Sequence, residues 1–427
     1  MTCNEMIERI HSRGRFSGKP GLHRIQALMK ALGDPQDQLK FVHVAGTNGK
    51  GSTCTMIASI LQQSGYKVGL YTSPYLVNFH ERIVVNNEMI SDEALVRLSL
   101  HTEEAAKHLC LPPDEHIGEF EFVTAVAFQF FLEQKCDIVV LETGLGGSYD
   151  ATNVIRVPEV AVITSISFDH VAVLGNTLEE IARTKAGIIK QGSIVVSSFG
   201  QNEAVYKVLK KHCPALIVPE KSVLIRKSVM GQTFTYKDGV YVTTLQGNYQ
   251  IQNAATAIEV VKVLTSRGFE ICQKHVYDGI KQAQIGARME IVSQNPRIII
   301  DGGHNEDGVR ATVESLYTSG CKACKLVVGM VADKSIEMCV RQFASVAKQM
   351  IVTQPRNERA LSADDLFRIA SIYCKNVVAF YSLPEALDYV LMNAEPDDTI
   401  VICGSLYLAG EAKEYFANRQ HSANLYE

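Results

Sequence analysis

The chain of 427 residues has no tryptophan, and its 16 tyrosines and 16 phenylalanines are ordinary core material rather than a platform for stacked bases. Its longest apolar run, near Val123–Leu132, falls short of the about 20 residues that a membrane-spanning helix needs. The opening residues, MTCNEMIERIHSRGRF, lack the apolar segment of a secretory signal peptide. The 11 cysteines are odd in number and show no disulfide framework, so we expect them to be reduced and the protein to be cytoplasmic.

Net charge is also small. The sequence has 42 Lys and Arg against 46 Asp and Glu, which gives −4 with neutral histidines. Surfaces that bind nucleic acid or anionic membranes usually carry excess positive charge, so we expect neither partner. A local positive pocket on such a protein still allows small anionic ligands. There is no internal repeat or low-complexity tract, and 46% hydrophobic residues supply the core of a globular protein.

The main pattern in the sequence is an alternation of short runs of β-branched residues with stretches of helical periodicity. Such runs are typical of buried strands in a parallel sheet whose two faces are covered by helices. The first expected strands are Phe41–Ala45, Lys67–Tyr71, Asp137–Leu141, Val160–Ile166 and Ile194–Ser197. Helical periodicity lies between them, at Cys54–Ser64 and Leu178–Gly187. The sequence therefore predicts an α/β fold.

A second α/β series follows. Val240–Leu245 is expected as an edge strand and Gln252–Leu264 as a helix. The later strands are expected at Arg297–Ile300, Lys325–Gly329, Gln349–Thr353, Asn376–Phe380 and Thr399–Cys403. Gln282–Pro296, with Gly286 and a Gln-Asn-Pro turn signal, is the best boundary segment. We expect domains at 1–290 and 291–427, with the reaction in a cleft between them.

A glycine-rich segment follows the first expected strand and opens a helix. Its residues are Gly46, Thr47, Asn48, Gly49, Lys50, Gly51 and Ser52. Glycines permit a tight turn that aims N–H groups at phosphate, while Lys50 supplies charge and Ser52 a hydroxyl for Mg²⁺. The spacing G-x-x-G-K-G-S departs from G-x-x-x-x-G-K-[ST], because one gap is shorter and Gly51 separates Lys50 from Ser52. The alternative is a glycine-rich turn with an exposed lysine; the flanking strand and helix favour binding of a nucleoside triphosphate.

Polar residues also follow the other expected strands. In an open parallel sheet, ligands gather outside the carboxyl ends of the strands. The residues in question are Ser73, Glu142, Asp169, His170 and, further along, Lys185. Glu142 suits a Mg²⁺ anchor, because the metal prefers hard oxygen ligands. Taken singly, Glu142 is also compatible with a charged turn, His170 with a hydrogen-bonded strand end, and Lys185 with a helix surface; their convergence on one edge favours function.

Several strings in fixed order resemble the folylpolyglutamate synthase/dihydrofolate synthase family of the ATP-dependent Mur ligase superfamily. They are His43–Thr53, Tyr71–Leu76, Glu119–Phe122, Glu142–Asn153, Asp169-His170, Lys185–Lys190 and Asp301–Asn305. The resemblance runs from about Lys19 to Tyr407. It implies an N-terminal P-loop, Mur-ligase-like ATPase domain with a parallel sheet. A smaller C-terminal Rossmann-like α/β domain would complete the ATP and glutamate site.

The resemblance also implies the reaction and its partners. ATP would phosphorylate a folate carboxylate, and the amine of L-glutamate would attack the acyl phosphate to form an amide. The implied cofactors are ATP and Mg²⁺ at two sites. The implied substrates are a reduced folate or dihydropteroate and L-glutamate, and we expect a monomer.

Residue roles in the first domain follow by the same resemblance. Residues 46–52 would cradle the triphosphate, Ser73 and Glu142 would hold one Mg²⁺, and His170 would hold a second. Lys185 matches a family lysine that is carbamylated, which would turn a cation into an acidic oxygen ligand. The alternative is an unmodified Lys185 that pairs with phosphate directly.

Further roles are implied along the second half of the chain. Asn253 matches a base-contacting asparagine, and Arg288 an arginine that reaches nucleotide phosphate, with an interdomain salt bridge as its alternative. Asp301 would meet the ribose, and His304 would face ATP or glutamate. Ser405 is a candidate on the glutamate side, and a strand-to-helix cap explains it equally well.

Two segments resemble the pteroate-facing part of the family. The first is Phe120, Glu121 and Phe122, which opens a helix whose continuation is simply buried. The second is Tyr149, Asp150 and Ala151, which continues the Glu142 loop. Members that also make dihydrofolate often carry an arginine after the paired glycines, where this chain has Ser148-Tyr149. The sequence therefore favours extension of polyglutamate alone.

Three alternatives stay open. One is a bifunctional enzyme that also joins glutamate to dihydropteroate. Another is a Mur-type ligase with a nucleotide-sugar peptide as acceptor, and the last is an ATP-binding switch without ligase chemistry. Cys321-x-x-Cys324 has no second metal-binding pair at zinc spacing, so we interpret it as coincidence or slight redox sensitivity.

Overall fold

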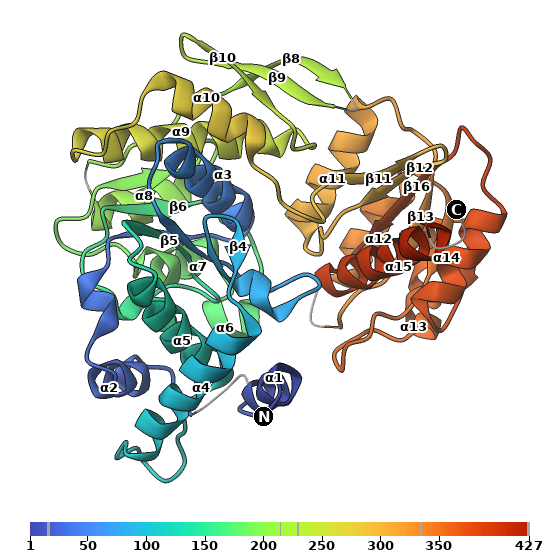
Figure 1. Ribbon diagram of the computed structural model, residues 1–427. Helices are drawn as coiled ribbons and strands as arrows, with labels where there is room; N and C mark the ends of the chain where they lie inside the picture. Colours follow the sequence, from blue (N-terminus) through green and yellow to red (C-terminus); the bar gives the residue numbers. More distant parts are fainter. Residues whose placement is uncertain (15–17, 214, 229, 333–334, 425–427) are drawn as a thin grey trace. The chain divides into compact units, whose positions relative to one another are not determined.

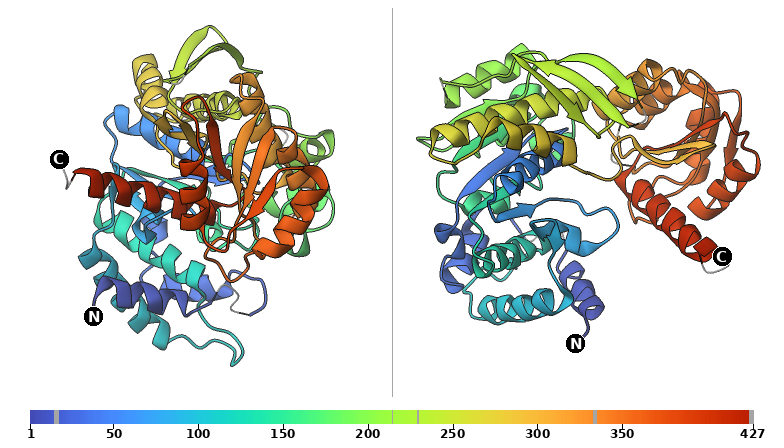
Figure 2. Two further views of the ribbon diagram at one scale, coloured as in Figure 1. Left: turned by 90° about the vertical axis from the view of Figure 1, so that its right-hand side faces the viewer. Right: turned by 45° about the horizontal axis from the view of Figure 1, so that its top comes forward.

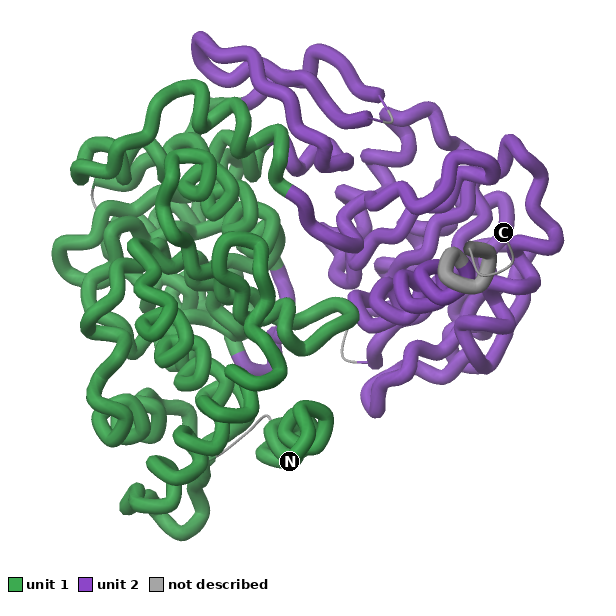
Figure 3. The backbone as a smooth tube through the Cα atoms, in the orientation of Figure 1, with its two compact units in different colours: residues 1–167, 174–221, 252–283 green, residues 168–173, 222–251, 284–427 purple. Residues whose placement is uncertain are grey.

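The computed structural model describes residues 1–14, 18–213, 215–228, 230–332 and 335–424. The chain divides into two compact units (Figure 3). Unit 1 comprises residues 1–167, 174–221 and 252–283, and unit 2 comprises residues 168–173, 222–251 and 284–427. Residues 168–173 and 222–251 thus group with the later part of the chain. The division into domains at residue 290 stays a prediction.

Unit 1 contains a seven-stranded sheet with the order β4-β3-β2-β5-β1-β6-β7. Its strands are β1 Phe41–Ala45, β2 Val68–Tyr71, β3 Ile83–Val85, β4 Glu88–Met89, β5 Ile138–Glu142, β6 Val160–Ile163 and β7 Val195–Ser197. The five expected strands are all present and pair in parallel. β3 and β4, which were not expected, extend the edge in antiparallel fashion.

Helices cover both faces of this sheet (Figure 1). They are α1 Cys3–His11, α2 His23–Ala31, η1 Pro35–Gln38, α3 Lys50–Gln63, η2 Phe79–Arg82, α4 Asp92–Lys107, α5 Glu119–Glu133, η3 Ala151–Val154, α7 Leu178–Ala186, α8 Glu203–His212, α9 Tyr249–Ser266 and α10 Gln273–Gln282. α3 packs on β1, β2 and β5, and α10 packs on α3. On the other face, α1, α2, α4 and α5 enclose one apolar core, and α7 and α8 enclose another with β6 and β7. Burial on both faces explains the lack of alternation in the sequence.

Unit 2 contains a six-stranded sheet with the order β11-β12-β16-β13-β14-β15. Its strands are β11 Glu290–Gln294, β12 Arg297–Ile300, β13 Cys324–Val328, β14 Ala347–Val352, β15 Val377–Ala379 and β16 Thr399–Cys403. The helices of this unit are α6 Val171–Leu174, which ends at its border, α11 Glu306–Thr318, α12 Ile336–Ala344, α13 Ala363–Tyr373, α14 Leu383–Met392 and α15 Leu406–Asn424. The second α/β series is therefore confirmed.

A separate antiparallel sheet also belongs to unit 2 and is seen most clearly on the right of Figure 2. It has the order β10-β9-β8, with β8 Val223–Ser228, β9 Gly231–Tyr236 and β10 Gly239–Thr243. β10 confirms the expected edge strand near Val240–Leu245. Lys227 of β8 donates from Nζ to the carbonyl oxygen of Ser315 in α11 at 3.0 Å, which ties this sheet to the rest of the unit.

The predicted boundary segment Gln282–Pro296 contains β11, which pairs with β12 through the Gln-Asn-Pro turn. One expectation needs correction. Cys321 and Cys324 form a disulfide, so the expectation that every cysteine is reduced is wrong for this pair. Along the described residues, no helix combines the length and the apolar character needed to cross a bilayer.

Candidate active site

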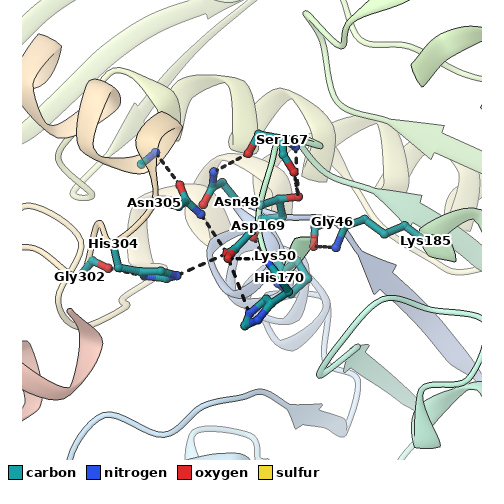
Figure 4. A network of polar contacts seen from close by, with 12 residues as sticks. Gly46, Asn48, Lys50, Ser167, Asp169, His170, Lys185, Gly302, His304 and Asn305 are labelled. Carbon is teal, nitrogen blue, oxygen red and sulfur yellow. Dashed lines mark hydrogen bonds and ion pairs between the residues drawn. The ribbon is translucent and has the colours of Figure 1, made fainter. Parts of the chain in front are cut away.

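The glycine-rich segment 46–52, the predicted phosphate loop, is held in unit 1 by residues that follow β6. The N–H groups of Thr47 and Asn48 donate to the carbonyl oxygen of Ser165, at 2.7 and 3.2 Å. The Thr47 hydroxyl donates to the Ser167 carbonyl oxygen and accepts from the Ser167 N–H, both at 3.1 Å. These bonds, shown in part in Figure 4, fix the loop before any ligand binds.

At two positions of the loop, steric crowding leaves room for glycine but not for a residue with a side chain. A Cβ on Gly46 would come within 1.8 Å of the Thr164 hydroxyl oxygen. Gly49 has φ +87°, and a Cβ there would come within 2.6 Å of Asn253 Oδ1. The loop therefore passes too close to its neighbours for side chains, as a phosphate cradle requires.

Lys50 is the first residue of α3, and Gly49 is its N-cap. Its Nζ donates to the Thr47 carbonyl oxygen at 3.4 Å, on the loop itself. Ser52, in the same first turn, is buried. An uncapped helix N-terminus next to a lysine favours an anion, so the residues present fit the phosphates of ATP.

Glu142 ends β5 beside the loop. Its partner across the sheet is Val44, two residues before Gly46. The carboxylate is only 4% exposed, accepts from the Ser73 N–H at 3.1 Å, and has Oε1 3.9 Å from Lys50 Nζ. The structure thus brings together three of the predicted residues. A buried carboxylate beside a hydroxyl-bearing residue is a donor set that fits Mg²⁺.

Lys185 comes from the last turn of α7 and is buried. Its Nζ donates to the carbonyl oxygen of Gly46 at 2.6 Å, which places it against the first residue of the phosphate loop (Figure 4). The loop after Glu142 packs on the same helix end, because a Cβ on Gly147 would lie 2.7 Å from the Lys185 carbonyl oxygen. Lys185 is therefore a component of the loop's surroundings and not a surface lysine.

Unit 2 groups a second set of polar residues. Asp169 Oδ2 accepts from the Asn305 side-chain amide at 3.1 Å and lies 3.7 Å from His304 Nε2. His304 Nδ1 donates to the Gly302 carbonyl oxygen at 2.9 Å, which leaves Nε2 directed at the carboxylate (Figure 4). His170 has φ +48°, and its Nε2 lies 3.8 Å from Asp169 Oδ1. Two histidines therefore share one carboxylate.

Asp301 is buried at the end of β12 and is fully engaged. Oδ1 accepts from the Gly303 N–H at 2.9 Å and the Thr312 hydroxyl at 2.6 Å. Oδ2 accepts from the Met289 N–H at 2.9 Å and the Tyr249 hydroxyl at 3.4 Å. Burial and this carboxylate raise the pKa of Tyr249 well above its usual value, which keeps the phenol protonated as a donor.

Arg288 lies between two residues in the left-handed region, Ala287 at φ +53° and Met289 at φ +51°. Its Nη1 donates to the Ala287 carbonyl oxygen at 3.3 Å, and a Cβ on Gly302 would lie 2.6 Å from the same nitrogen. Such backbone geometry persists only where its surroundings impose it, as they often do at ligand sites.

The pteroate-facing candidates differ in exposure. Phe120 lies against Gly144, where a Cβ would come within 2.6 Å of its ring, and the Arg82 guanidinium is 5.8 Å from the ring centre. Glu121 accepts from Arg24 Nε at 3.1 Å and caps its own helix. Phe122 is 0% exposed, so its ring offers no surface to a ligand in this structure.

The residues of the second pteroate-facing candidate segment, 149–151, also differ in exposure. Tyr149 is 64% exposed, whereas Asp150 and Ala151 are buried. Asp150 accepts from the Leu145 N–H at 2.7 Å and the Thr152 hydroxyl at 2.5 Å, and burial raises its pKa despite these bonds. Asp150 therefore holds the shape of the loop.

Ser405 accepts from the Tyr407 N–H at 3.0 Å at the start of α15. This bond is the one that the helix-capping alternative requires, and contact of Ser405 with glutamate stays a prediction. Asn253 lies beside Gly49, as described above, so its carboxamide adjoins the phosphate loop. Its contact with a base stays a prediction.

Five site residues were not assigned from the sequence. They are Ser165, Ser167, Tyr249, Asn305 and Thr312. The two serines follow β6, so the strand-end rule already contained their signal. Asn305 belongs to Asp301–Asn305, a segment that resembles the family, but it has no role assigned from the sequence. Tyr249 and Thr312 lie in helices, and no neighbouring sequence motif identifies them.

Comparison with known proteins gives the family. The Mur ligase middle domain model matches residues 121–261, and the model named Mur ligase, glutamate ligase domain matches residues 287–406. Folylpolyglutamate synthase of Lacticaseibacillus casei is 36% identical over 97% of this chain and 98% of that protein. The chain belongs to the folylpolyglutamate synthase/dihydrofolate synthase family. The expected resemblance is confirmed.

Two further relatives agree with this membership. Dihydrofolate synthase/folylpolyglutamate synthase of Bacillus subtilis (strain 168) is 35% identical over 95% of this chain and 97% of that protein. The solved structure of Mycobacterium tuberculosis folylpolyglutamate synthase complexed with ADP superposes with a TM-score of 0.89, at 29% identity over 97% of this chain and 98% of that chain. The protein is therefore an enzyme, a ligase of the Mur type, with the α/β fold class predicted for it.

Proposed function

We propose that this ligase adds L-glutamate to the carboxylate of a reduced folate at the expense of ATP. The observation that carries the proposal is the grouping of Lys50, Glu142 and Ser73 around a preformed phosphate loop, in a family whose relatives are named folylpolyglutamate synthases. The chemistry has two steps. A folate carboxylate oxygen bonds to the γ-phosphorus of ATP as the bond to ADP breaks. The glutamate amine nitrogen then bonds to the acyl carbon, phosphate leaves with its oxygen, and the amine gives up a proton.

The phosphate loop would bind ATP in this reaction. The N–H groups at the start of α3 and the Lys50 ammonium would hold the phosphates, with the loop fixed in advance by Ser165 and Ser167. The ADP-bound relative supports a nucleotide at this site. Preorganised donors of this kind contribute most to catalysis when charge develops on the transferred group.

Ser73, Glu142 and His170 are the proposed ligands of Mg²⁺ at two sites. Bound Mg²⁺ would neutralise phosphate charge as it develops. Glu142 is suited to this role because its Oε2 is oriented by the Ser73 N–H and its charge faces Lys50. His170 is oriented through Asp169, with its backbone N–H donating to Oδ1 at 2.8 Å.

Lys185 is proposed to be carbamylated. Its position against Gly46 would place the new carboxylate oxygens near the phosphate loop. A carbamate nitrogen keeps one N–H, so its bond to the Gly46 carbonyl oxygen is compatible with the modification.

Residues of unit 2 would bind the remainder of the nucleotide and the glutamate. We assign nucleotide contact to Arg288, whose guanidinium has several N–H donors besides the one bonded to Ala287, and to His304, whose Nδ1 is held by the Gly302 carbonyl oxygen. The carboxylate oxygens of Asp301 already accept four hydrogen bonds within the protein. Asn253 would contact the nucleotide from α9. We retain 1–290 and 291–427 as the proposed functional domains.

Phe120 and Tyr149 are the proposed contacts of the folate. The Phe120 ring centre lies 5.8 Å from the guanidinium of Arg82, which is paired with Glu119 at 2.9 Å, and Tyr149 is exposed. We propose that the protein works as a cytoplasmic monomer on these small molecules. Neither nucleic acid nor membrane is among its proposed partners, and its net charge of −4 supports that assignment.

A bifunctional enzyme is the second candidate, because the Bacillus subtilis relative is named for both activities. Ser148 weighs against it. Its N–H and hydroxyl both donate to the Thr184 carbonyl oxygen, at 2.8 and 3.1 Å, so this side chain faces α7 and supplies no positive charge to a substrate.

Product mass spectrometry distinguishes the candidates. The purified protein is incubated with ATP, Mg²⁺ and L-glutamate, and with either tetrahydrofolate or dihydropteroate. We expect glutamate to be added to tetrahydrofolate only. Addition to both acceptors would establish the bifunctional enzyme. Addition to neither, with ATP binding intact, would overturn the folate assignment and leave the ligase class.

A further inference from the structure

Three potential metal ligands converge in unit 1, among residues that the ligase site does not use. Cys3 Sγ lies 3.5 Å from His80 Nε2, and His80 Nε2 lies 2.9 Å from Asp92 Oδ1. All three donor atoms lie within 4.8 Å of one another. They come from α1, η2 and α4, so the cluster joins three segments that are distant in the sequence.

The hydrogen bonds of His80 show which of its ring nitrogens faces the cluster with a lone pair. Asn78 Oδ1 accepts from the His80 backbone N–H at 3.0 Å, which fixes the amide oxygen on this side. His80 Nδ1 lies 2.6 Å from the same oxygen and therefore donates to it. In a neutral imidazole the lone pair is then on Nε2, the ring nitrogen nearest Cys3 Sγ and Asp92 Oδ1, and a metal ion would bind there.

The spacing of the donor atoms suits zinc. Tetrahedral Zn²⁺ with a bond of about 2.3 Å to sulfur and about 2.0 Å to nitrogen separates these two ligands by about 3.5 Å. The Cys3–His80 separation is 3.5 Å. Zinc-bound histidines usually donate their other N–H to an oxygen, as His80 does to Asn78. The set of thiol, imidazole and carboxylate is also a zinc set by ligand type.

Helix caps hold the backbones of the three residues in place. Cys3 is the first residue of α1, behind a capping box between Thr2 and Glu5. Asp92 is the first residue of α4, behind the N-cap Ser91. His80 is buried in η2, whereas the Asp92 side chain is 77% exposed and leaves a path for an ion.

A divalent cation at this cluster would stabilise the thiolate of Cys3 directly. The Asp92 carboxylate, which lies in the same cluster, would share the ion with it.

We propose that Cys3, His80 and Asp92 bind one Zn²⁺, with water as the fourth ligand. The ion would fasten α1 to η2 and to the start of α4. η2 closes the segment that begins at Thr72, whose N–H donates to the Arg82 carbonyl oxygen at 3.2 Å. Zinc would therefore stabilise this part of unit 1, and its role is structural.

The test is titration of metal-free, full-length protein with Zn²⁺ and with Co²⁺. We expect one ion per chain, a thiolate-to-cobalt charge-transfer band, and a rise in the thermal unfolding temperature with Zn²⁺. Cys3→Ser should abolish the band, and His80→Gln and Asp92→Asn should weaken Zn²⁺ binding. Asn78→Ala, which removes the bond to the His80 ring together with the N-cap bond of η2, should weaken it about 10- to 100-fold.

Matched controls are Cys272→Ser and His108→Gln, which change an exposed cysteine and an exposed histidine of unit 1. Both should bind as the unchanged protein does. Circular dichroism of the metal-free variants checks that each is folded. A cobalt band that survives Cys3→Ser, or a wild-type affinity for Zn²⁺ no higher than that of His80→Gln, would overturn the proposal. Turnover of ATP by folded Cys3→Ser should be unchanged, so the result is independent of the ligase function.

Discussion

Glu142 and Lys50 place opposite charges 3.9 Å apart at the end of β5 and the start of α3. The carboxylate is nearly inaccessible to water, and its second oxygen is occupied by the Ser73 N–H. A buried charge pair is costly to build, so its position beside a phosphate loop indicates a ligand that uses both charges.

Glu142→Gln and Lys50→Ala are expected to abolish ADP formation while the protein stays folded. The glutamine keeps an oxygen for Ser73 but loses the charge that would hold Mg²⁺. We expect turnover to fall by at least about 10²- to 10³-fold, the usual loss when one electrostatic contact to the reacting group is removed. Glu203→Gln, on the exposed face of α8, is the matched control and should keep full turnover. Retained activity in either site variant, measured by coupled ADP release, would refute the assigned role.

Lys185 permits a direct test by intact mass. Carbamylation adds the mass of one CO₂ under native conditions, and the mass should return to the sequence value after acid denaturation. Lys185→Ala should lack the added mass and the ligase activity, and exposed Lys207→Ala should keep both. An unmodified native mass together with full turnover would establish the alternative, in which Lys185 acts as a cation at Gly46.

His43 predicts a dependence of stability on pH. Its Nε2 lies 2.8 Å from the Thr152 hydroxyl, and its buried Nδ1 has no hydrogen-bond partner among the described residues. Burial lowers its pKa to about 3, and the charge of Lys190 adds to this. In the unfolded chain the pKa is about 6.5. Below about pH 6.5 the unfolded state therefore binds a proton that the folded state does not, and stability falls as pH decreases toward 3.

Urea unfolding at several pH values checks this. For one such group the free energy of unfolding changes by up to about 1.4 kcal/mol per pH unit. His43→Gln should reduce the slope between pH 6.5 and pH 5, whereas exposed His108→Gln should not. Equal slopes in the unchanged protein and His43→Gln would mean that His43 is not the titrating group.

At the scale of helices and strands, the strands that the sequence predicts most accurately are those buried on both faces of a sheet. β1, β12 and β16 have the predicted bounds, because runs covered on both faces are apolar throughout. The short antiparallel strands β3, β4, β8 and β11 have one polar face or too few residues for a pattern. Gln282–Pro296 is therefore predicted as a boundary segment, although about a third of it forms β11, which pairs with β12.

Gly279 sets how closely α10 packs on α3. A Cβ there would lie 2.5 Å from the Ile60 Cα, and the Ser59 hydroxyl donates to the Gly279 carbonyl oxygen at 2.8 Å. Gly279→Ala must separate the two helices. Overpacking costs about 1–3 kcal/mol, and alanine regains about 1 kcal/mol of helix propensity, so we expect a net loss of up to about 2 kcal/mol.

The urea midpoint measures this loss. Lys274→Ala, at an exposed position of the same helix, should leave the midpoint unchanged within error. A Gly279→Ala variant as stable as the unchanged protein would show that the two helices adjust without cost.

At the scale of the whole molecule, the sequence identifies which residues carry chemistry better than it identifies their partners. The phosphate loop, Glu142 and Lys185 are recognisable from the sequence, because each directly follows a predicted strand or lies in a segment that resembles the family. Contacts such as Tyr249 with Asp301, 52 positions apart, arise only when distant elements pack. Ser405 shows that the same residue type at a strand end can also accept a hydrogen bond at the start of a helix.

The choice of acceptor is a property of the complete enzyme, and Ser148 is where we expect it to respond. The side chain packs against Gly187 and bonds to Thr184, so a longer side chain must turn away from α7 toward the exposed Tyr149. Ser148→Arg would supply a guanidinium, which binds carboxylates through paired hydrogen bonds. We expect the variant to gain glutamylation of dihydropteroate and to keep activity toward tetrahydrofolate, at a stability cost of about 0.5–1.5 kcal/mol for the lost hydrogen bond. Ser148→Ala, which loses the bond without adding charge, should show the same stability cost and no new product. A folded Ser148→Arg enzyme with an unchanged product spectrum would show that this position does not select the acceptor.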